Sequence, residues 1–144
     1  MDAKTYLEQV KMLDIKIKQL EDRLARLRET AGGAAAIRYD KLNVQVSVAT
    51  DMVEKNVLRL VEMENKIFEE KVKLEATKNA IVEQIQGLND ARYVDLLYKR
   101  YINLESFEQI SVDMSYDYTY TRALHGEAIG YFEMYYSNIL HNLT

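Results

Sequence analysis

Apolar side chains recur in steps of four and three along the first part of the chain. The series is Tyr6, Val10, Leu13, Ile17, Leu20, Leu24 and Leu27. This spacing is a heptad seam, and charged residues fill the remaining faces, as in a solvated coiled coil. It predicts a long helix that ends near Thr30, because the following Ala31-Gly32-Gly33 lowers helix propensity and can supply a C-cap.

A second apolar series repeats every seven residues along a predicted helix that runs from about Thr50 to Gln86. Its members are Val53, Leu60, Ile67, Leu74, Ile81 and Leu88, and a wider apolar face adds Val61, Phe68, Val72 and Val82. The wider face suits packing against the first helix and one further element. A helix of ~36 residues would be about 54 Å long, more than the first helix can cover. We therefore expect a homodimer, with a monomeric hairpin as the alternative.

The segment between these helices, residues 31–50, has no clear periodicity. Val44, Val46 and Val48 alternate as in a short strand, but no partner strand is evident. We expect a loop. Because long unstructured loops are unusual in compact domains, this loop either packs along the helices or serves as a contact segment.

Capping residues divide the chain after Gln86 into shorter predicted helices. Asn89 or Asp90 can cap a helix that begins at Ala91, and Ser106 has a glutamine three residues on, the capping-box spacing for a helix that begins at Phe107. Asp117 can cap a following helix. The inward face of that helix would carry Thr121, Leu124, Ala128 and Phe132. Three helices joined by two short turns are typical of a helix-turn-helix module.

The sequence thus predicts an all-α fold with two parts. Residues 1–87 would form a long antiparallel helical hairpin, and residues 88–144 a helix-turn-helix module with an extended last helix. The absence of Pro and the low number of glycines, five in 144 residues, agree with long helices.

The chain has no Cys, which excludes disulfides and thiolate metal sites and favours a reducing compartment. No apolar run approaches the ~18 residues that span a bilayer, and the N-terminus lacks a signal-peptide core. We expect a soluble cytoplasmic protein that does not associate with membranes.

The net charge of −4 lies entirely in the predicted C-terminal module. Residues 1–87 carry fifteen basic and fifteen acidic side chains, whereas residues 88–144 carry four basic and eight acidic ones. Neutralisation of phosphates provides most non-specific affinity for DNA, so this module should bind DNA weakly unless cations gather locally.

No pattern of catalytic or metal-ligating residues is evident. The Gly32-Gly33 pair lacks the rest of a phosphate-binding loop, and the glutamates of the second helix have no Glu-x-x-His pair. We expect a catalytic role for neither His125 nor His141. We therefore expect a protein that is not an enzyme and that needs no metal or cofactor.

The segment LLYKRYINLESFEQISVDMSYDYTYTRALHGEAI resembles region four of the sigma factors. It resembles more closely the small phage and prophage proteins related to the ArpU and RinA late-transcription regulators. The matching positions are Leu97, Arg100-Tyr101-Ile102, Phe107, Ile110, the Tyr116 turn, Leu124-His125-Gly126 and Ala128-Ile129, with looser matches at Tyr6-Leu7, Arg38-Tyr39-Asp40-Lys41 and Asn43-Val44-Gln45. The resemblance implies a phage-type transcriptional regulator that binds promoter DNA, with its last helix in the major groove, or binds RNA polymerase.

On this resemblance, the candidate DNA- or partner-binding residues are Lys99, Arg100, Tyr118, Thr119, Tyr120, Arg122, His125 and Gly126. Only Arg122 is basic on the outward face of the last helix, where the related proteins place several arginines, lysines or glutamines. Lys99, Arg100 and Arg122 could still form a local positive edge. Alternatively, the module is a protein-docking surface, because nine of the eleven tyrosines lie in the last third of the chain. Such an acidic, tyrosine-rich face could mimic DNA and inhibit a host protein.

Overall fold

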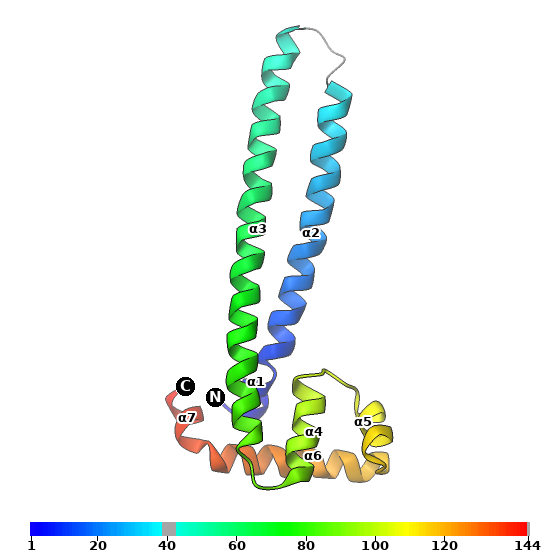
Figure 1. Cartoon of the computed structure of the whole chain (residues 1–144), viewed down its shortest axis with the longest axis vertical. Coiled ribbons are helices and arrows are strands. Elements are labelled where there is room, and N and C mark those ends of the chain that lie inside the picture. Colours follow the sequence, from blue (N-terminus) through cyan, green and yellow to red (C-terminus); the bar gives the residue numbers. More distant parts are fainter. Residues whose placement is uncertain (39–42, 144) are drawn as a thin grey trace. The chain divides into compact units, whose positions relative to one another are not determined.

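A computed structural model describes residues 1–38 and 43–143, and the side chains of residues 1–30 and 51–143. The described part is helical and contains no strand, which confirms the predicted all-α class (Figure 1). Its helices are α1 (Ala3–Leu7), α2 (Gln9–Arg38), α3 (Asn43–Gln86), α4 (Ala91–Tyr101), α5 (Phe107–Met114), α6 (Tyr118–Tyr135) and α7 (Ser137–Asn142). None of the helices in these ranges combines the length and the apolar character needed to cross a bilayer.

Helices α2 and α3 extend into the segment that was predicted as a loop. Helix α2 continues to Arg38, and α3 begins at Asn43 rather than near Thr50. The predicted loop of residues 31–50 is therefore too long, and its centre, residues 39–42, lies outside the described residues. The glycine pair in α2 costs about 1 kcal/mol per glycine, but alanines, the best helix formers, flank it on both sides.

The chain divides into two compact units, and each is described by itself. One unit comprises Asp14–Lys73, and the other comprises Met1–Leu13 with Leu74–Thr144. The predicted domain boundary between residues 87 and 88 stays a prediction.

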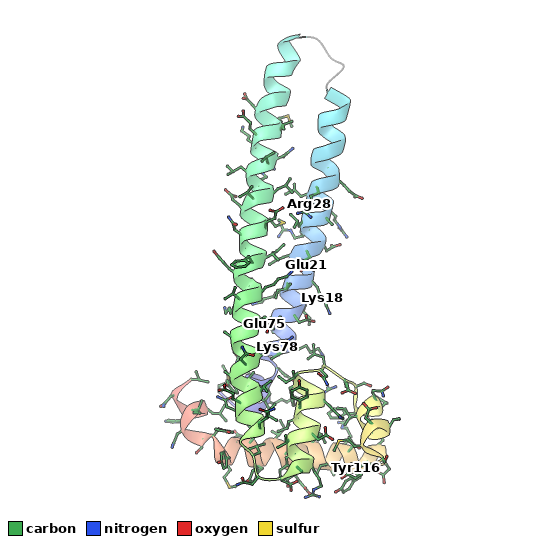
Figure 2. The ribbon with its side chains drawn as sticks, in the orientation of Figure 1. Lys18, Glu21, Arg28, Glu75, Lys78 and Tyr116 are labelled. Atoms are coloured by element: carbon green, nitrogen blue, oxygen red, sulfur yellow. The ribbon has the colours of Figure 1, made fainter. Side chains whose placement is uncertain are left out.

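In the unit Asp14–Lys73, α2 and α3 run antiparallel. Glu21 pairs with Lys71 at 3.0 Å, and Arg28 pairs with Glu64 at 2.6 Å. Arg28 lies seven residues after Glu21 in α2, whereas its partner Glu64 lies seven residues before Lys71 in α3, as expected for antiparallel helices. Figure 2 labels Glu21 and Arg28 on α2. The seam between the helices buries Ile17, Leu24 and Ile67. The apolar face of α3 that was predicted to pack against a further element is instead exposed at Val61, Phe68 and Val72.

In the other unit, α6 lies against α1, α4, α5 and α7 (Figure 1). Its buried face consists of Thr121, Leu124, Ala128 and Phe132, as predicted from the helical spacing. The first helix differs from the prediction, because it is divided at Glu8 into α1 and α2. The last helix is also interrupted: α6 ends at Tyr135 and α7 follows, with Leu140 buried but Ile139 exposed.

Three predicted N-caps are confirmed. The Asp90 carboxylate accepts a hydrogen bond from the Arg92 amide at 2.9 Å, and α4 begins at Ala91. The Ser106 hydroxyl accepts from the Gln109 amide at 3.2 Å at the start of α5. The Asp117 carboxylate accepts from the Tyr120 amide at 2.7 Å at the start of α6. Each cap satisfies an amide that the first helical turn leaves without a partner.

Candidate functional site

A tight turn connects α5 to α6. Ser115 adopts the left-handed conformation (φ 58°, ψ 38°), and its amide donates to the Val112 carbonyl. The Tyr116 amide donates to the Ser111 carbonyl at 3.0 Å, and α6 starts after Asp117. A non-glycine residue in this conformation costs about 1–2 kcal/mol, so the surrounding contacts must hold it. The turn therefore sets the direction in which α6 leaves α5.

A buried pair of hydroxyl groups joins α5 to α6. The Ser111 Oγ and Thr121 Oγ1 atoms lie 3.0 Å apart, and both residues are buried. The Thr121 hydroxyl donates to the Asp117 carbonyl at 2.9 Å, and the single proton of Ser111 lies within hydrogen-bonding reach of both Thr121 and the Phe107 carbonyl, whose oxygen is 2.7 Å from Ser111 Oγ. A buried polar group is costly unless it is hydrogen-bonded, so this network favours one rotation of α6 against α5. That rotation determines which residues of α6 face solvent.

The outward face of α6 contains most of the candidate residues. Tyr118, Thr119, Tyr120, Arg122 and Gly126 are all exposed. A Cβ atom at Gly126 would meet no other atom within 4 Å, so packing within the chain does not require glycine at this position. Because glycine has no side chain, a ligand can approach the main chain of α6 closely in the middle of this face.

Arg100 and Arg122 gather at the ring of Phe107, at the start of α5. Their guanidinium carbons lie 4.1 Å and 5.0 Å from the ring centroid, within the range of a cation–π interaction. Arg100 donates to the Glu105 carbonyl at 3.0 Å, and Arg122 donates to the Tyr118 hydroxyl at 3.0 Å. Neither arginine forms an ion pair with a carboxylate of the described residues. Their charges are therefore available to an anionic ligand.

His125 packs beside this cluster. Its Nε2 atom lies 2.7 Å from the Tyr101 hydroxyl oxygen, and its ring lies edge-on to Phe107 with centroids 4.9 Å apart. Burial lowers the pKa of His125 to about 4, and the positive charges of Arg100, Lys4 and Arg122 contribute in that order. Burial also raises the pKa of Tyr101 to about 12. The Tyr101 hydroxyl and the His125 imidazole are therefore both neutral near neutral pH and share a hydrogen bond, and His125 supports the cluster by packing.

Lys4 was not among the predicted site residues, yet it contributes positive charge at His125. It lies on α1, which packs against α6 through Tyr6 and Phe132, whose ring centroids are 6.2 Å apart. No local feature of the sequence marks Lys4, because its place depends on the packing of α1 against a helix more than a hundred residues away. Glu8, the C-cap residue of α1, has the opposite charge, and this negative charge raises the pKa of Tyr101.

Lys99 and Tyr120 make other contacts. Lys99 pairs with Asp95 at 2.9 Å, and this hydrogen bond raises the pKa of Lys99. The Tyr120 hydroxyl accepts from Arg92 at 3.0 Å. The predicted positive edge of Lys99, Arg100 and Arg122 is thus brought together only in part, as the two arginines at Phe107.

Many acidic side chains of this unit have partners of their own. Asp90 pairs with Arg92 at 2.9 Å, and Asp95 pairs with Lys99. The Asp113 carboxylate accepts a hydrogen bond from the Gln109 side chain at 2.8 Å, and the nearness of Asp113 raises the pKa of the Glu105 carboxyl. These contacts explain how two unpaired arginines can lie together in a segment with an excess of acidic residues.

Comparison of the chain with models of protein families, with curated proteins and with solved structures finds no match. The geometry of α1, α4, α5 and α6 is therefore the basis on which a function can be proposed.

Proposed function

We propose that this protein is a transcriptional regulator of the phage type, which binds promoter DNA through a helix-turn-helix formed by α5, the turn at residues 115–117 and α6. Helices α2 and α3 would serve as a helical-hairpin scaffold. The observation that carries the proposal is the pair of arginines, Arg100 and Arg122, which lie on Phe107 without carboxylate partners beside the exposed face of α6.

The dimensions of α6 agree with this role. The major groove of B-DNA is about 12 Å wide and accepts one α-helix. Arg122 lies in the second turn of α6, where a recognition helix contacts base edges, and a guanidinium can bind guanine through two hydrogen bonds. The exposed hydroxyls of Tyr118 and Thr119 can hold phosphates without charge. Arg100, on α4, would neutralise a phosphate beside the groove.

The test is binding to duplex DNA selected from a random library, followed by titration at two salt concentrations. Loss of the guanine contact in Arg122→Ala should weaken specific binding by about 1–3 kcal/mol, which is about 5- to 150-fold. Lys18→Ala is the control, because it removes one exposed positive charge from α2, in the other unit. Equal losses in the two variants, or a wild-type protein that selects no sequence at low salt, would contradict the proposal.

A second candidate function is docking to a protein, and a group of tyrosines favours it. The rings of Tyr93 and Tyr131 lie 5.4 Å apart and those of Tyr131 and Tyr135 lie 6.0 Å apart, with Tyr135 half exposed. The Tyr93 hydroxyl donates to Glu127 at 3.4 Å, so this face is acidic as well as aromatic. Tyrosine is enriched at protein interfaces because it offers a large contact area at low entropic cost.

A pull-down of host proteins, RNA polymerase among them, distinguishes the two candidate functions when it is carried out with matched variants. If docking is the function, Tyr135→Ala should lose the captured protein and Arg122→Ala should retain it. If the tyrosines serve only for packing, Tyr135→Ala should capture the same proteins as the wild type.

A further inference from the structure

Helices α2 and α3 form a groove within the unit Asp14–Lys73. The groove has a volume of about 770 Å³, and Leu20, Leu27 and Met63 supply its apolar lining. An adjoining hollow of about 300 Å³ shares Leu20 with it and extends it to Lys16. A partner that lies along both hollows would follow about 21 Å of α2, from Lys16 to Thr30 at 1.5 Å per residue, with the apolar Leu20 and Leu27 in the middle part.

This groove is strongly basic. Its cations are Lys16, Arg23, Arg26, Arg59 and Lys66. Arg26 pairs with Asp22 at 3.3 Å, whereas the other four make no ion pair with any described carboxylate. Glu62 and Glu70 are the acidic side chains that line it. The groove thus fits a ligand that is apolar in the middle and acidic at its edges.

The side of α3 that lies opposite the groove is apolar in the middle and acidic at its edges. It carries an apolar stripe that is largely exposed: Val57 (51%), Val61 (46%), Phe68 (68%) and Val72 (53%). Phe68 is nine residues from Arg59, so at 100° per residue the stripe lies about 180° around the helix from the groove. The acidic residues Glu54 and Glu75 flank the stripe and make no ion pair with a described cation.

We propose that the α3 stripe of one copy of this chain docks into the α2–α3 groove of a second copy. The lengths agree, because Val57 to Val72 spans about 22 Å of helix and the groove about 21 Å. The charges also agree, since the acidic flanks of the stripe would meet the unpaired cations of the groove. An exposed Phe in a row with three valines is the kind of apolar patch that marks an interaction site.

A symmetric contact of the stripe with itself is less favourable. In an antiparallel pairing about the midpoint between Glu64 and Asn65, Val61 would face Phe68 of the second copy. Glu54 would then face Glu75 of the second copy, and the symmetry would repeat this contact between like charges. The stripe and the groove lie on opposite sides of α3, so one pair of copies cannot satisfy both surfaces. The contact is therefore head-to-tail, and copies can add beyond the dimer.

Sedimentation velocity of the whole chain tests this assembly. The wild type should form dimers and larger species as its concentration rises. Val61→Ser with Phe68→Ser removes the stripe, Arg23→Glu with Arg59→Glu reverses the groove, and each double variant should stay monomeric. An equimolar mixture of the two should form dimers and nothing larger, because each variant keeps the surface that the other lacks.

Matched changes make the result decisive. Lys4→Glu with Lys11→Glu changes the net charge by the same amount as the groove variant, in the other unit, and should assemble like the wild type. Phe68→Ala, which favours helix, should weaken assembly even if the double serine variant does not fold. A wild type that is monomeric, or that stops at dimers, would overturn the proposal. So would a mixture of the two double variants that remains monomeric.

Discussion

Protonation of His125 should destabilise the fold as the pH falls below the ordinary pKa of histidine. The imidazole is hydrogen-bonded to the Tyr101 hydroxyl and packs edge-on to Phe107, while burial and nearby cations oppose a positive charge on the ring. The pKa of His125 is lowered from 6.5 to about 4. Between these two values the unfolded chain binds a proton that the folded chain does not, so stability falls as the pH falls. Above pH 6.5 the contribution is fully present, and below about pH 4 it is lost.

The size of the effect follows from the shift. One pKa unit corresponds to 1.36 kcal/mol, so a shift from 6.5 to about 4 sets an upper limit of about 3 kcal/mol. The ring is partly exposed to solvent, which screens the charges around it, and we therefore expect about 1–2 kcal/mol. Because small domains are stable by only about 5–15 kcal/mol, such a loss is readily measured.

The assay is urea unfolding of the wild type and of His125→Gln at about pH 7.5 and about pH 4.5, followed by circular dichroism. Glutamine can still bond with the Tyr101 hydroxyl and does not titrate. The wild type should lose about 1–2 kcal/mol more than the variant between these two pH values. NMR titration of His125 gives the pKa directly. A value near that of free histidine, or equal losses in the two proteins, would refute the reasoning.

Three further predictions concern the unit that contains α6. Ser111→Ala and Thr121→Val should be non-additive by about 1 kcal/mol in a double-mutant cycle, because each removes the same buried hydrogen bond; additive effects would show that the hydroxyls do not interact. Gly87→Ala would place a Cβ atom 2.5 Å from the Tyr136 hydroxyl, which bonds to the Gln84 carbonyl. This change should cost about 1–2 kcal/mol in urea unfolding, and Tyr136→Phe should remove most of that cost; an unchanged stability of Gly87→Ala would be inconsistent with this geometry. Finally, DNA phosphates beside Arg100 would offset its charge, so NMR titration with the selected duplex should show a higher pKa for His125, and no change would place the bound DNA elsewhere.

Features that depend on residues close together in the chain were predicted well. Asp90, Ser106 and Asp117 cap the helices that follow them, since a cap requires only a suitable side chain and the amides two or three residues on. The buried face of α6 follows from the period of 3.6 residues, because Thr121, Leu124, Ala128 and Phe132 lie on one side of any helix in this register.

Predictions failed where local signals compete. The glycine pair after Ala31 and the alternating valines suggested a break in helix, but α2 continues to Arg38 and α3 begins at Asn43. Propensities differ by only about 1 kcal/mol per residue, so neighbouring alanines can outweigh two glycines. The apolar width of α3 was predicted correctly as a pattern, but a pattern does not say what covers it, and Phe68 is exposed.

The sequence by itself determined the helical class, the starts of α4, α5 and α6, and the inward face of α6, because each depends on spacing along the chain. The tertiary structure decided which charges meet. Arg100 and Arg122 come together at Phe107 from three different helices, while Lys99 turns to Asp95. Lys4, on α1, adds positive charge near His125 because α1 packs on α6. Net charge counted along the chain cannot reveal such a cluster, because electrostatic energy depends on distances in space.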